Sequence, residues 1–86
     1  MTIEDFLRKT KEQLEAGAKD NDLSIWVEDT LCDNYYAFEK ENAFLAAEMN
    51  DYLPDICEQM EPGMESEKFA SELLEEVDRL LKLAGK

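Results

Sequence analysis

At 86 residues the chain is long enough for one domain, covering 1–86, and too short to enclose a large internal active site. Apolar residues make up 44% of it, which is too many for a disordered acidic tail, and no stretch approaches the roughly 18 consecutive apolar residues of a membrane span. The formal net charge of −13 excludes direct binding to nucleic acid and to anionic membranes, and it favours basic protein surfaces as partners.

The first half of the chain predicts two amphipathic helices. The first covers about 3–18, with Thr2 as its N-cap. The polar stretch at 19–22 ends it and offers a cap to the second helix, which covers about 23–39. The apolar side of the first helix holds Ile3, Phe6, Leu7 and Leu14. That of the second holds Leu23, Val27, Leu31, Asn34 and Phe38, bordered by Trp26, Thr30 and Tyr35.

A third helix is predicted over about 42–60, and it contains Pro54. Proline inside a helix removes one backbone donor and clashes with the preceding turn, so we expect a kink or a break at this residue. The apolar arc of the segment holds Leu45, Met49, Tyr52, Leu53, Ile56 and Met60. The roughly opposite arc holds Glu48, Asp51, Asp55 and Glu58.

A fourth helix is predicted over about 64–84, after a turn at 61–63 and before Gly85. Its apolar residues recur at alternating steps of four and three, which is typical of a seam between packed helices. Short loops between helices favour antiparallel neighbours. The sequence therefore predicts an all-α fold, a small antiparallel bundle of three to four helices. The predicted core positions of the last helix are Leu73, Val77 and Leu80.

The negative charge is concentrated in the middle of the chain. Residues 1–19 hold four acids and four bases, and residues 68–86 hold the same numbers. The other 14 acids lie in 20–67, where Lys40 is the only base. A surface with both acids and bases is equally soluble, so solubility alone does not explain why the acids are concentrated in residues 20–67.

Catalytic and metal chemistry find little support in the sequence. There is no histidine and no Cys-x-x-Cys pair, so zinc has almost no ligands. The stretch from Asp20 begins like a calcium loop, but the glycine and glutamate that such a loop needs are replaced by Ile25 and Leu31. We expect no enzyme, cofactor or metal. No export signal precedes the first helix, which predicts a cytoplasmic protein with Cys32 and Cys57 reduced.

The acidic middle is the predicted partner-binding surface. Carboxylates three or four residues apart share one helix face, and exposed aromatic residues beside them resemble interface anchors with a charged rim. The candidate residues are Asp29, Asp33, Tyr36, Phe44, Glu48, Asp51, Asp55 and Glu58. The alternative is an acidic face that only solvates the fold, with Tyr36 and Phe44 covered by a neighbouring helix.

Two functions are compatible with this surface. One is an inhibitor or decoy that occupies the basic nucleic-acid-binding surface of a partner protein. Short, strongly acidic chains of this general character occur among anti-restriction proteins, anti-CRISPR proteins and immunity proteins of nuclease toxins, an analogy of class only. The other is an assembly module, either a homodimer or a regulatory subunit, that binds through an apolar helical face: the seam of the last helix, or Tyr36 with Phe44. Binding that weakens with salt distinguishes the first from the second.

Overall fold

Each helix of the protein begins where a polar side chain accepts a hydrogen bond from the backbone N–H three residues later. A computed structural model describes residues 1–85, and the four N-caps in it are Thr2, Asp20, Asn42 and Ser66. These caps satisfy backbone donors that a helix start otherwise leaves unpaired. The helices that follow them are α1 (Ile3–Glu15), α2 (Asn21–Glu41), α3 (Ala43–Cys57) and α4 (Glu67–Leu83).

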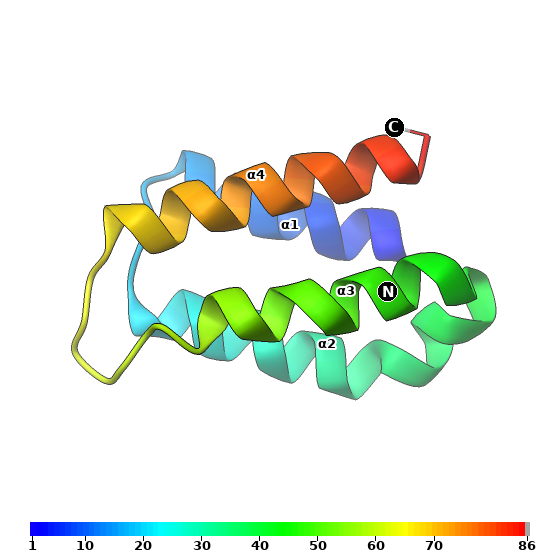
Figure 1. Ribbon diagram of the computed structural model, residues 1–86, viewed down its shortest axis with the longest axis horizontal. Coiled ribbons are helices and arrows are strands. Elements are labelled where there is room, and N and C mark those ends of the chain that lie inside the picture. Colours follow the sequence, from blue (N-terminus) through cyan, green and yellow to red (C-terminus); the bar gives the residue numbers. More distant parts are fainter. Residues whose placement is uncertain (86) are drawn as a thin grey trace.

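The four helices form an antiparallel bundle (Figure 1). Consecutive helices run in opposite directions, and α4 returns to pack beside α1, so each helix has two neighbours around a shared core. The bundle measures 35 × 22 × 19 Å. The predicted fold class is confirmed, with four helices rather than three.

The core is filled by the apolar arcs that helical periodicity indicates. Phe6 lies at its centre, with ring centroids 5.8 Å from Trp26 and 5.5 Å from Phe38. The predicted core positions of α4 are all buried: Leu73, Val77 and Leu80. Buried apolar surface of this kind is the main stabilising contribution in a domain of this size.

Some positions differ from the predicted core, and Tyr52 and Thr10 are examples. The apolar arc of α3 predicts Tyr52 in the core, but its side chain is about half exposed, and the Arg79 guanidinium lies over the ring 5.0 Å from its centroid. Thr10 is buried although it is polar. Its hydroxyl donates a 2.8 Å hydrogen bond to the carbonyl of Phe6, which removes the cost of burying an unpaired donor.

The ends of the helices differ from the predicted bounds by up to three residues. α1 ends at Glu15 because Gly17 turns the chain with a φ of 97°, a conformation that favours glycine. α4 begins at Glu67, since Ser66 rather than residue 64 supplies the cap. α3 is not broken at Pro54, because the proline lies only one turn before the last helical residue. It removes a single hydrogen bond at a point where the helix is about to end.

The loops at one end of the bundle are held together by backbone contacts. Ser66 N–H donates a 2.8 Å hydrogen bond to the carbonyl of Lys19, and Asp20 pairs with Glu65 in an isolated antiparallel bridge. This contact joins the α1–α2 loop to the α3–α4 loop. It holds the starts of α2 and α4 next to each other.

Candidate partner-binding surface

Most of the excess negative charge of the chain lies on the hairpin of α2 and α3. Between Asn21 and Cys57 there are nine acids and one base, Lys40. The two helices run side by side, opposite the pair formed by α1 and α4 (Figure 1). A segregation that is visible along the sequence therefore becomes an acidic half of the molecule.

Several bases of the α1–α4 pair form ion pairs with acids of the same two helices. Lys11 Nζ lies 2.8 Å from Asp78 Oδ1, and this hydrogen bond raises the pKa of Lys11. Arg79 pairs with Glu76, and their hydrogen bond raises the pKa of Arg79. Paired charges of this kind largely cancel beyond a short distance. The α1–α4 pair therefore leaves most of the negative field of α2 and α3 in place.

On α2, the three predicted binding residues lie together on the outer face. Asp29, Asp33 and Tyr36 follow one another at steps of four and three, and all three side chains are exposed. Tyr36 is 70% exposed, so no neighbouring helix covers it. Lys40 lies over its ring with Nζ 4.6 Å from the centroid, which gives this aromatic residue a cationic neighbour.

On α3, four of the five predicted residues share a second exposed strip. Phe44 is 62% exposed, and Asp51 and Asp55 lie farther along the helix on the same side. Glu58 follows directly after the last helical residue and is also exposed. The alternative in which Tyr36 and Phe44 are covered by neighbouring helices is wrong.

Glu48 is set apart from the other candidates. Its side chain is only 22% exposed and turns toward α4, where Oε1 lies 3.6 Å from Arg79 Nη1. An acid already paired with an internal base offers less to an external partner than its free neighbours do. The structure therefore places Glu48 in a contact between α3 and α4.

A groove separates the two strips, and the sequence patterns did not indicate it. It has a volume of about 470 Å³ and is lined by Glu28, Leu31, Cys32, Tyr35, Asn50 and Pro54. On both helices, acids of the strip come one position after groove residues in the sequence. One position is a rotation of about 100° around the helix axis, so these acids lie beside the groove and not in it. The spacing of 28, 32 and 35 is visible in the sequence, but only the packing of α2 on α3 turns those positions into one wall of a groove.

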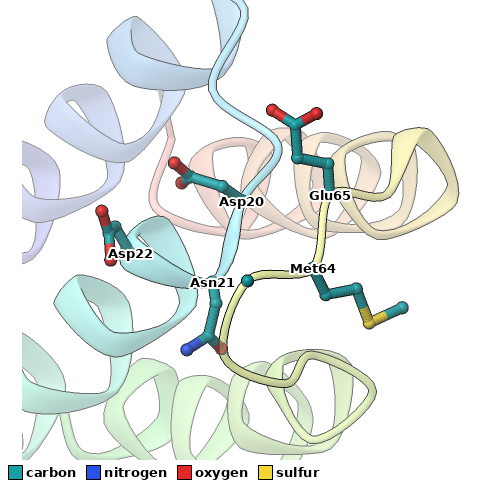
Figure 2. A pocket seen from close by; sticks show the side chains of 6 residues that line it. Asp20, Asn21, Asp22, Met64 and Glu65 are labelled. Carbon is teal, nitrogen blue, oxygen red and sulfur yellow. The ribbon is translucent and has the colours of Figure 1, made fainter.

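A second hollow, of about 240 Å³, lies at the linked loops and holds three carboxylates (Figure 2). Asp20, Asp22 and Glu65 line it, but their side chains do not point toward one common centre. The carboxylate of Asp20 already accepts the hydrogen bond that caps α2. Within residues 1–85 no group of three or more potential ligands is arranged to hold a metal ion.

The two cysteines differ in exposure, and this gives a testable expectation. Cys32 is exposed in the groove, whereas Cys57 is buried, and burial together with the nearby charge of Glu28 raises its pKa to about 12. Only a thiolate attacks a disulfide reagent or an alkylating agent, so Cys57 stays unreactive at about pH 8.

A thiol assay on the folded protein should therefore report one fast-reacting thiol, and two once denaturant is added. Mass spectrometry of the labelled peptide should identify the fast one as Cys32. Two thiols that react equally fast without denaturant would show that Cys57 is not enclosed.

No protein-family model, curated protein or solved structure matches the chain. Within the described part of the chain, no helix combines the length and the apolar character that crossing a membrane demands.

Proposed function

We propose that the protein is a non-catalytic inhibitor or decoy that occupies the basic nucleic-acid-binding surface of a partner protein. The single observation that carries the proposal is the acidic half formed by α2 and α3, which contains nine acids and one base. A field of one sign repels nucleic acid and attracts the surfaces that bind it.

The arrangement of the carboxylates supports this proposal. Asp51 and Asp55 of α3 and Glu58, which follows its last residue and keeps a helical backbone conformation, recur at steps of four and three, so adjacent Cβ atoms lie about 5 to 6 Å apart. A row of negative charges at this spacing can occupy successive phosphate sites on a basic groove. None of the three side chains makes an ion pair or hydrogen bond within residues 1–85, so all three are free to do so.

The exposed aromatic residues support an interface rather than a solvated face. Tyr36 lies one turn beyond Asp33 on α2, and Phe44 lies on the same side of α3 as Asp51, two turns before it. An aromatic side chain exposed to water contributes little to stability, whereas the same side chain enclosed in a complex is a typical energetic anchor.

The competing function is an assembly module, a homodimer or a regulatory subunit, that binds through an apolar helical face. The seam of α4 is not available for this role, because Leu73, Val77 and Leu80 are buried within the bundle. The large apolar side chains that remain exposed are dispersed over the molecule rather than gathered on one helix face, and those on α2 and α3, Ile25, Tyr36, Phe44 and Tyr52, have acids near them in the sequence. This distribution favours a partner that is basic over one that is apolar.

The salt dependence of binding tests the proposal. Immobilised protein should retain basic proteins of a lysate at low salt and release them at high salt, because screening shortens the range of the attraction. Excess duplex DNA or RNA should release the same proteins at low salt, since a decoy and a nucleic acid compete for one surface. Binding that survives high salt, or that nucleic acid does not displace, contradicts the decoy and favours the apolar interface.

A further inference from the structure

Two residues that line the groove between α2 and α3 carry hydrogen-bond acceptors without a partner of their own. The carboxylate of Glu28 stands at the groove and has no ion-pair partner within residues 1–85. On the opposite side, Pro54 has no N–H, so the backbone carbonyl of Asn50 lacks the donor that a helix normally supplies four residues on. Asn50 and Pro54 both line the groove, so the carbonyl that lacks its helical donor belongs to a groove residue.

The local charge of the groove is negative and is not balanced by a base of its own helices. Lys40 is the one base on α2 and α3, and it lies over the ring of Tyr36 on the outer face. The charge of Glu28 reaches across to α3, where it contributes to the raised pKa of Cys57. A ligand of this groove is therefore cationic and rich in donors.

The side walls of the groove favour a guanidinium over an ammonium group. Tyr35 is partly buried against the core, which holds its ring in place, and Pro54 contributes a second rigid ring. A guanidinium is planar, weakly hydrated and carries five N–H donors, so it can stack on such a ring while it donates to several acceptors at once. An ammonium is compact and strongly hydrated, and it gains less from the same walls.

We propose that the groove lined by Glu28, Tyr35, Asn50 and Pro54 is a pocket for an arginine side chain of the basic partner. The arginine stacks against Tyr35, pairs with Glu28 and donates to the Asn50 carbonyl. The inference rests on the proposed function, since the acidic strips on both sides of the groove attract the partner, and it adds the residue type by which the partner is recognised. A volume of about 470 Å³ is ample for one side chain.

Synthetic heptapeptides test the pocket directly. Each carries three lysines on either side of one central residue, which is arginine, lysine or leucine. At low salt the arginine peptide should bind about fivefold more tightly than the lysine peptide, which has the same charge. Calorimetric titration of the intact protein measures both affinities.

A matched pair of variants locates the effect. Glu28→Gln removes the carboxylate of the groove, and Asp33→Asn removes one charge from the exposed strip of the same helix. Both should weaken the lysine peptide slightly and to the same degree. Glu28→Gln alone should also abolish the preference for arginine, bringing the two peptides to equal affinity.

Alkylation gives a second readout without a mutation. Cys32 lines the groove and is exposed, whereas Cys57 is buried, so N-ethylmaleimide at neutral pH adds its bulk to the groove alone. The modified protein should bind the lysine peptide as before and lose the preference for arginine. Circular dichroism of the modified protein checks that the helices are intact.

Failure of this inference differs from failure of the proposed function. The arginine pocket is contradicted if the arginine and lysine peptides bind equally well. It is also contradicted if the preference for arginine persists in Glu28→Gln and after alkylation. Neither result contradicts the proposed role of the acidic surface. Tightest binding of the leucine peptide also overturns the pocket, because the groove then holds an apolar anchor. Absence of salt-sensitive binding for every peptide overturns the acidic surface and the pocket together.

Discussion

Replacing Leu73 with alanine is expected to lower the free energy of unfolding by about 2 to 5 kcal/mol. Leu73 is fully buried at the centre of α4, so the change removes apolar contacts and leaves a cavity that close-packed neighbours fill only in part. A domain of this size has a total stability of about 5 to 15 kcal/mol, so the variant should be much closer to unfolding. Urea denaturation followed by circular dichroism measures the shift of the midpoint.

The same helix provides the control. Leu83 is 46% exposed at the end of α4, so Leu83→Ala makes the same chemical change where little burial is lost. Its effect should stay within about 0.5 kcal/mol. Equal midpoints for Leu73→Ala and the parent protein would show that α4 does not complete the core.

Reversing the charge of the α3 strip is expected to abolish binding to a basic partner. The triple variant Asp51→Lys, Asp55→Lys and Glu58→Lys changes three exposed residues that lie outside the core, so the bundle should remain folded. The loss should appear chiefly as slower association at low salt, by about tenfold or more, because electrostatic attraction accelerates encounter. Surface plasmon resonance with a partner captured at low salt measures association and dissociation separately.

A second triple variant separates local from total charge. Glu12→Lys, Glu15→Lys and Glu75→Lys change three exposed acids of α1 and α4, and each triple variant brings the net charge from −13 to −7. The variant of α1 and α4 should associate almost as fast as the parent and still compete with nucleic acid for the partner. If the two triple variants behave alike, total charge governs the binding and the strip on α3 is a solvated surface.

Much of the fold can be predicted because it depends on local signals. Thr2 was identified as an N-cap from its place before an amphipathic stretch, and the structure confirms it. The burial of Leu73, Val77 and Leu80 follows from a period that any amphipathic helix imposes on its core face. The predicted helix ends are less accurate, because Gly17 ends α1 through its backbone conformation and Ser66 starts α4 through a side-chain cap, and the apolar pattern records neither.

The candidate surface was predictable in composition and only partly in arrangement. The exposure of Tyr36 and Phe44 could not be decided from a helical wheel, because it depends on which helix packs nearby. The same limit applies to Glu48 and Tyr52, whose surroundings are set by Arg79 from α4. Arg79 lies 31 positions beyond Glu48 in the sequence, so no local pattern joins them.

The sequence by itself determined that the protein is helical, where its core positions lie along each helix, and that its negative charge belongs to residues 20–67. These properties are functions of spacing and composition, which a chain carries before it folds. Only the tertiary structure decided that α2 and α3 lie side by side, so that the acidic segment becomes one half of the bundle with a groove between two strips. The physical reason is that a groove is made by residues of two helices at once, and their juxtaposition depends on how the buried faces of all four helices pack together.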